Sequence, residues 1–231
     1  MKTIGLIGGM SWESTSEYYR IINEAIRENL GGLHSAKIVM YSVDFEEIEQ
    51  LQHEGKWDDA TNLMIDAASR VERGGADFVL ICTNTMHRMA EDVIGNINIP
   101  LLHIADATAE KIASSGLKKI GLLGTKFTME QDFYKGRLIR KYGLEVIIPN
   151  ESDREIVHNV IYNELCLGEI KDTSREQFKI IIKSLIDDGA QGIILGCTEL
   201  PLLINQNDCA VPLFDTTEIH AKAAVEYALR E

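Results

Sequence analysis

The 231-residue sequence has only four prolines and no tract rich in glycine and serine, which argues against a long disordered segment. No apolar run approaches the ~18–20 residues of a membrane-spanning helix. The chain reaches the glycine pair Gly8-Gly9 too early for the apolar core of a signal peptide. With 45% apolar residues, the sequence predicts a folded cytoplasmic protein of one large or two small domains.

Basic residues are scarce. Lysine and arginine number 23 against 36 aspartates and glutamates, so the formal net charge is −13. A field of this sign repels nucleic acids and anionic membranes, and we expect neither as a partner. A carboxylate ligand would have to be held by local hydrogen-bond donors.

The four cysteines form no Cys-x-x-Cys pair and have no histidine at zinc spacing, so we expect no metal site. In the cytoplasm a disulfide framework is not expected either. Each cysteine is then buried filler or a reactive thiol; Cys166 and Cys209, which have no polar context, are interpreted as structural.

Short apolar runs alternate with longer amphipathic stretches along the chain. This alternation predicts an α/β fold with parallel sheets covered by helices on both faces. Thr128, followed by Gln131, is expected to open a helix that runs to Arg140. The predicted strands are 4–7, 36–41, 78–81, 101–104, 120–123, 144–148, 192–195 and 211–214, and examples of predicted helices are 14–28, 58–73 and 177–188.

The chain also repeats itself. Residues 4–9 recur at 120–125, residues 79–85 at 193–199, and residues 99–102 at 211–214, with offsets of 116, 114 and 112. Three similar offsets in the same order predict two pseudo-symmetric α/β domains. In parallel sheets, ligands bind beyond the carboxyl ends of the strands, so we expect an active site in the cleft between the domains.

Four loops at such strand ends carry the candidate residues, at 8–14, 83–87, 125–128 and 196–199. The turn after Gly8-Gly9 suits a small carboxylate, but a purely structural turn and a nucleotide site are alternatives; the spacing Gly-x-Gly-x-x-Gly is absent. Cys197 follows an apolar strand, where backbone N–H groups can lower a thiol pKa. It is equivalent to Thr83 across the repeat.

Two groups facing one carbon from opposite sides could remove a proton from one face and return one to the other, inverting a stereocentre without a cofactor. The carbanion would need hydrogen bonds to its carboxylate and a site that excludes water. Asn84, Thr85 and Thr125 could supply neutral donors.

The segments 8–15, 82–87, 103–108 and 193–200 resemble the aspartate/glutamate racemase family, whose members work without PLP and have two α/β domains with one cysteine from each. The similarity is greatest to enterobacterial members described as broad-specificity or L-aspartate/glutamate-specific. The resemblance implies that Cys197 takes the proton from the L-enantiomer. The glutamate at position 199 is similar to the residue that aspartate racemases have after Cys-Thr, whereas glutamate racemases typically have histidine there.

Two departures from the family pattern matter. Its first cysteine aligns with Thr83, and Cys82, one residue earlier on a strand, should point to the opposite face. A threonine hydroxyl is a poor base, so one competent thiol remains. In addition, Leu167 stands where aspartate-specific relatives have a lysine, which leaves a broader substrate range open.

We therefore predict cofactor-independent racemisation of L-aspartate, L-glutamate or a broader set of amino acids by a homodimer. Alternatives are a single-cysteine decarboxylase of malonate-type acids and a non-catalytic amino-acid-binding protein. The predicted domains are 1–105 plus 213–231, and 106–212. The catalytic candidates are Cys197 and Thr83, and the substrate-binding candidates are Met10, Ser11, Asn84, Thr85, Thr125, Thr198 and Glu199.

Overall fold

The computed structural model describes residues 1–230 and divides into two compact units. The first comprises residues Met1–Ile104 and the chain from His220 onwards, and the second comprises Ala105–Ile219. Each unit has its own parallel sheet with helices packed against it, so the predicted α/β fold class is confirmed.

The sheet of the first unit has three parallel strands in the order β2-β1-β3. They are β1 (Ile4–Gly8), β2 (Ile38–Ser42) and β3 (Phe78–Ile81). The central strand pairs along both edges, with Ile4 opposite Ile38 on one side and Phe78 on the other. Every residue of β1 and β3 is buried, which explains why both strands are continuous apolar runs.

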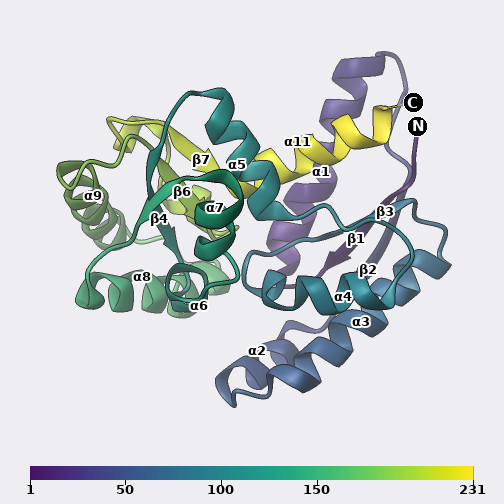
Figure 1. Cartoon of the computed structure of the whole chain (residues 1–231), viewed down its shortest axis with the longest axis horizontal. Helices are drawn as coiled ribbons and strands as arrows, with labels where there is room; N and C mark the ends of the chain where they lie inside the picture. The colour runs from purple at the N-terminus through teal and green to yellow at the C-terminus, as the bar shows by residue number, and fades with distance from the viewer. Residues whose placement is uncertain (231) are drawn as a thin grey trace. The chain divides into compact units, whose positions relative to one another are not determined.

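Strand alternation divides the apolar side chains of this sheet between two faces. Ile4, Leu6, Phe78 and Leu80 pack with α1 (Trp12–Leu30) and with α11 (Thr216–Leu229), which returns from the second unit (Figure 1). Ile7, Val79 and Ile81 pack on the opposite face with α2 (Phe45–His53), α3 (Trp57–Arg73) and α4 (Ala90–Asn96). The expected return of the C-terminal helix to the first unit is thus observed.

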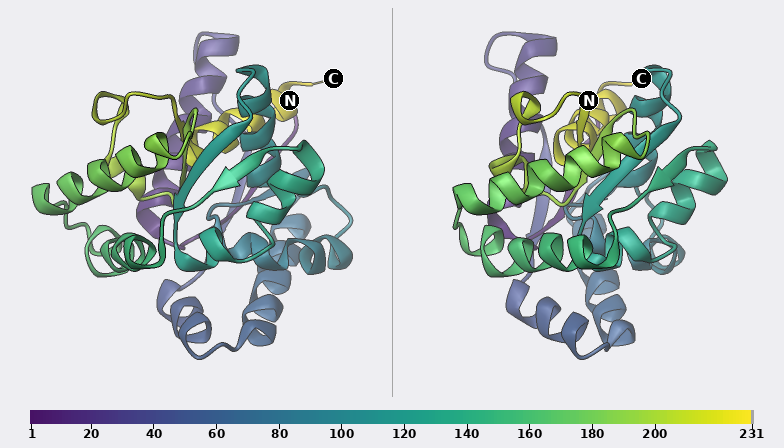
Figure 2. Two further views of the ribbon diagram at one scale, coloured as in Figure 1. Left: turned by 60° about the vertical axis from the view of Figure 1, so that its left-hand side comes forward. Right: turned by 90° about the vertical axis from the view of Figure 1, so that its left-hand side faces the viewer.

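The sheet of the second unit has four parallel strands in the order β5-β4-β6-β7. They are β4 (Lys119–Gly124), β5 (Glu145–Ile147), β6 (Ile193–Gly196) and β7 (Leu213–Asp215). Its longer helices include α8 and α9, which lie beside the strands in Figure 2. The helical segments are α5 (Ile104–Ser114), α6 (Lys126–Glu130), α7 (Lys135–Tyr142), α8 (Glu151–Asn163), η2 (Leu165–Leu167), α9 (Asp172–Asp187), α10 (Leu200–Leu203) and η3 (Gln206–Asp208).

The structure differs from three details of the sequence-based prediction. Residues 101–104 form only one bridge, between Leu101 and Val79, and α5 already begins at Ile104. Thr125, not Thr128, is the N-cap of a helix. The helix does not run continuously to Arg140, because it ends with α6 at Glu130 and a second helix, α7, begins at Lys135. Strand β7 pairs with β6, so residues 213–215 belong to the second sheet and not to the first domain as predicted.

No helix within residues 1–230 is both long enough and apolar enough to cross a membrane.

Candidate active site

In the first unit, the segment after β3 carries the predicted residues Thr83, Asn84 and Thr85. Cys82 is fully buried in the cluster that includes Leu6 and Leu80, and burial raises its pKa far above the usual range. Thr83 is half-buried, and both residues lie beyond Ile81, the last residue of β3. The chain then turns into η1 (Thr85–Met89), with Asn84 and Thr85 both buried.

The turn after β1 lies beside this segment, because β1 and β3 are neighbours and Ile7 is opposite Ile81. Gly9 has a φ of +95°, and a Cβ there would lie 2.2 Å from the Val43 carbonyl oxygen. The Gly9 N–H donates to the Thr15 hydroxyl at 2.8 Å, and that hydroxyl donates to the Ser11 carbonyl at 2.8 Å. The glycine pair is therefore required by the packing of the turn itself, whatever the turn binds.

Met10 and Ser11, the other candidates on this turn, are both buried. The Ser11 hydroxyl accepts from the Ser14 N–H at 3.4 Å, which makes Ser11 the N-cap of α1. Helix α1 therefore begins directly at this turn, with its positive dipole end at the carboxyl edge of the sheet.

In the second unit, the equivalent strand ends lie side by side. Gly124 at the end of β4 pairs with Gly196 at the end of β6, and a Cβ on Gly124 would lie 2.7 Å from the Gly196 carbonyl oxygen. The two glycines thus allow the strands to approach closely just before Thr125 and Cys197. The Thr125 hydroxyl accepts from the Thr128 N–H at 3.3 Å and caps α6.

Cys197, Thr198 and Glu199 form one hydrogen-bonded group. The Cys197 thiol donates to Glu199 Oε2 at 3.0 Å, and the Thr198 hydroxyl donates to the same oxygen at 2.8 Å. Cys197 is 8% exposed, and the other two side chains are buried as well. A carboxylate that accepts from a neighbouring thiol holds that thiol's proton in a defined direction.

This environment keeps Cys197 protonated at rest. Burial raises the pKa of its thiol well above the usual value, and the negative charge of Glu199 raises it further. Cys166, from η2, also raises the pKa of Cys197 through a Coulombic interaction. The prediction of a lowered pKa at this strand end is therefore wrong, because desolvation and the adjacent carboxylate outweigh any backbone N–H groups.

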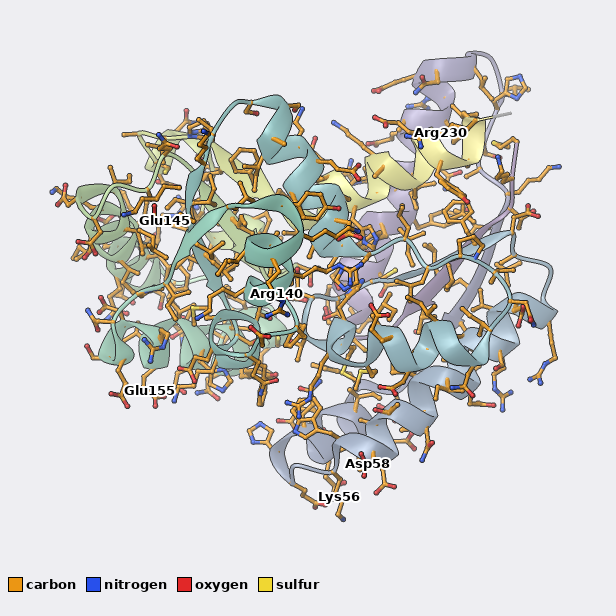
Figure 3. All side chains as sticks on the ribbon, viewed as in Figure 1. Lys56, Asp58, Arg140, Glu145, Glu155 and Arg230 are labelled. Atoms are coloured by element: carbon orange, nitrogen blue, oxygen red, sulfur yellow. The ribbon has the colours of Figure 1, made fainter. Side chains whose placement is uncertain are left out.

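Charged side chains around the second unit mostly form ion pairs. Lys126, directly after Thr125, pairs with Glu155 on α8, which is labelled in Figure 3. Asp106 lies between Arg137 and Lys141; although burial raises its pKa, these two ion pairs give a net lowering. Leu167, at the position where the resemblance implies a lysine, carries no charge and is 69% exposed. Residues 1–230 contain no group of three histidine, cysteine or acidic side chains arranged to hold a metal ion.

Comparison with known proteins identifies the family. Residues 7–224 match the model of the Asp/Glu/hydantoin racemases. The chain belongs to this family. It is 24% identical to RacX of Bacillus subtilis, a broad specificity amino-acid racemase, over 96% of each chain.

Two crystal structures are similar over their full lengths and that of this chain. A candidate Asp/Glu racemase from Yersinia pestis is 58% identical with a TM-score of 0.94. An aspartate racemase homologue from Pyrococcus horikoshii is 39% identical with a TM-score of 0.85. The resemblance found in the sequence is thus confirmed, and the protein is an isomerase of the amino-acid racemase type.

Sequence reasoning missed two features around these candidate residues. The effect of Cys166 on Cys197 could not be predicted, because the two residues are 31 positions apart in the sequence and no motif joins them. The contacts of His87 were missed as well, although its position four residues after Thr83, at helical spacing, was a usable signal.

Proposed function

We propose that the protein racemises amino acids without a cofactor, with L-aspartate and L-glutamate as the leading substrates, and that Cys197 is the thiol that exchanges the Cα proton. The observation that carries the proposal is the hydrogen bond from the Cys197 thiol to Glu199 Oε2 at 3.0 Å. It supplies the buried thiol with a group that can accept its proton.

The thiol must lose its own proton before it can take one from a substrate. When the proton moves from Cys197 Sγ to Glu199 Oε2, the S–H bond breaks and an O–H bond forms, and the net charge of the pair is unchanged. Charge is then moved within a buried site and not created there, which costs less than ionising the thiol alone. The thiolate then takes the Cα proton. The electron pair of the broken Cα–H bond stays on the substrate, which becomes a carbanion.

Glu199 was expected to bind substrate, but its contacts favour this proton-accepting role. A buried carboxylate would repel the carboxylates of aspartate or glutamate. The Thr198 hydroxyl, donating to the same oxygen at 2.8 Å, stabilises the negative charge while the thiol is protonated. We assign both residues to the thiol and not to the substrate.

Neutral donors stabilise the carbanion in this proposal. Asn84, Thr85 and Thr125 follow the carboxyl ends of parallel strands, where hydrogen bonds to the α-carboxylate would offset the charge that develops in the transition state. Met10 and Ser11 lie on the turn beside the Thr83 segment and remain candidates for the same carboxylate.

Thr83 is proposed as the residue opposite Cys197, on the basis of its equivalence across the repeat. Its hydroxyl is far less acidic than a thiol and serves poorly as a base at neutral pH. Because the two enantiomers have equal free energies, the forward and reverse values of kcat/KM must be equal. Inversion is therefore slow in both directions, while proton removal from the L-enantiomer by Cys197 is fast.

A broad substrate range is part of the proposal. Leu167 offers no charge for a distal carboxylate at the position where the resemblance implies a lysine. The similarity to a broad specificity racemase supports the same conclusion. We expect the enzyme to be a cytoplasmic homodimer, which sedimentation at several protein concentrations would test.

The test is incubation of the protein with a panel of L-amino acids in D2O, followed by measurement of Cα deuterium and chirality. We expect deuterium at Cα for several substrates with the wild type and a large loss of exchange with Cys197→Ala. Equal exchange by both proteins would contradict the role of Cys197. Release of carbon dioxide from arylmalonates without any exchange on amino acids would identify a decarboxylase, and binding without either reaction a binding protein.

A further inference from the structure

His87 lies in the first unit with both ring nitrogens engaged by the backbone. Its Nδ1 lies 2.8 Å from the Thr83 carbonyl oxygen, and the Ile104 N–H donates to its Nε2 at 3.2 Å. A carbonyl oxygen can only accept and a backbone N–H can only donate. The ring is therefore neutral, with its proton on Nδ1, and donates to Thr83.

Other aromatic rings hold the His87 ring in place. The ring of His103 is 4.5 Å from that of His87, centroid to centroid, and the ring of His220 is at 5.8 Å. His220 Nε2 donates to the Leu102 carbonyl at 2.8 Å, and because burial lowers the pKa of this ring and keeps it neutral, its Nδ1 accepts from the Tyr18 hydroxyl at 2.9 Å. All three histidines are buried, so His87 has little freedom to turn.

The bond from His87 orients the segment that carries Thr83. The Thr83–Asn84 peptide is trans and planar, so its carbonyl and its N–H point in opposite directions. Because the Thr83 carbonyl is directed at the imidazole, the Asn84 N–H is directed away from it. The backbone N–H of His87 also donates to the Asn84 carbonyl at 3.1 Å, and this bond holds the next peptide of the same turn.

We infer that His87 is a positioning residue for the racemase reaction, acting through the Thr83–Asn84 peptide. The inference rests on the proposed function, in which Thr83 and the Asn84 donors face the substrate. His87 itself transfers no proton, because its Nδ1 proton is held by the Thr83 carbonyl and its Nε2 lone pair by Ile104. Losing the Nδ1 donor would let the peptide rotate and misdirect both groups.

Two substitutions distinguish the hydrogen bond of Nδ1 from that of Nε2. In His87→Asn the side-chain amide lies near the position of Nδ1 and can still donate to Thr83. In His87→Gln the amide lies near Nε2 and can accept from Ile104, but no donor reaches Thr83. We expect His87→Gln to lower kcat for Cα exchange by on the order of 10- to 100-fold with little change in KM, because the effect of misplaced groups grows in the transition state. We expect His87→Asn to retain most of kcat.

Thermal unfolding of both variants controls for a merely structural role, since each loses the ring and its packing on His103. If the two variants lose activity in parallel with stability, or if His87→Gln matches the wild type, the inference is overturned. The nitrogen-15 shifts of the wild-type imidazoles give a readout that needs no activity: a protonated Nδ1 and an unprotonated Nε2 at His87 support the inference, and the reverse overturns it. Absence of exchange by the wild type would instead refute the proposed function.

Discussion

Each unit has a candidate catalytic residue just beyond the end of a buried strand, Thr83 two residues after Ile81 and Cys197 one residue after Gly196, but holds it in a different way. In the first unit, Thr83 is half-buried and its backbone carbonyl is bound by His87. In the second unit, Cys197 is buried and its side chain is bound by Glu199. Both units therefore have the strand and the turn. In the first unit a hydrogen bond holds the backbone carbonyl of Thr83, and in the second a hydrogen bond holds the thiol proton of Cys197.

The residue before each of these positions shows how far the equivalence extends. Gly196 precedes Cys197, and a Cβ at Gly196 would lie 2.8 Å from the Leu123 carbonyl oxygen, so glycine is needed for the close approach of β4 and β6. Cys82 precedes Thr83 and fills space in the apolar core. A second cysteine is thus present in the first unit, but its side chain is buried in the apolar core with Leu6 and Leu80.

The largest expected effect comes from removing the thiol of the second unit. Cys197→Ala should lower Cα–H exchange of the L-enantiomer by ~10²–10⁴-fold, the contribution of a positioned acid or base. Cys209→Ala, which removes a partly buried thiol that is not among the candidate residues, is the matched control and should exchange like the wild type. Nuclear magnetic resonance of the Cα proton in D2O measures both rates.

Giving the first unit a thiol should make the two halves more alike. Thr83→Cys should raise the rate of inversion by at least about tenfold, because a thiol is a far better proton donor and acceptor than a hydroxyl. Chiral chromatography of the product measures inversion directly. An unchanged or lower rate in a folded Thr83→Cys variant would contradict the equivalence of the two positions.

The contact between Glu199 and Cys197 can be tested by thiol titration. Glu199→Gln removes a negative charge beside the sulfur, so the pKa of Cys197 should fall while burial still keeps it above the usual value. The pH dependence of iodoacetamide alkylation should shift to lower pH, whereas Glu176→Gln, an exposed substitution on α9, should leave it unchanged. The same Glu199→Gln variant should exchange Cα protons more slowly, since the thiol has lost its acceptor. An alkylation profile identical to that of the wild type would show that the carboxylate does not act on the thiol.

The smallest expected effect concerns the stability of the first unit. Burial lowers the pKa of His220 to about 4, with Tyr18 and His87 as its ring neighbours. The unfolded chain binds this proton at higher pH, so the stability is full above ~6.5 and is lost as the pH falls toward 4. Between about pH 7.5 and about pH 5, the wild type should lose about 2 kcal/mol more unfolding free energy than His220→Gln. Urea titrations at the two pH values measure this, and equal losses would contradict it.

The sequence predicts most of the fold because its signals are local and repeated. Apolar runs identify β1, β3, β4 and β6, and the repeat predicts that the segments of β1 and β3 recur in the second unit as those of β4 and β6. The helix break after α6 was missed, because Thr125 and Thr128 are both plausible caps and only the packing decides between them. The place of β7 was missed because its pairing with β6 is a tertiary contact that no local pattern encodes.

The candidate residues were predictable as a set, but their states were not. Strand alternation separates Cys82 from Thr83 in the sequence itself. The pKa of Cys197 depends on burial and on the direction of the Glu199 carboxylate, and neither can be read from neighbouring letters. The neutral tautomer of His87 depends on Ile104, which is 17 residues away in the chain.

The most direct test of the account compares the two enantiomers of one substrate, L-aspartate and D-aspartate, at equal concentration in D2O. If Cys197 serves one face efficiently and Thr83 serves the other poorly, the recovered L-enantiomer gains Cα deuterium much faster than it inverts, and the recovered D-enantiomer gains it slowly. Equal rates of deuterium incorporation into recovered L and D isomers would mean that both faces have equally competent groups, and would contradict the account.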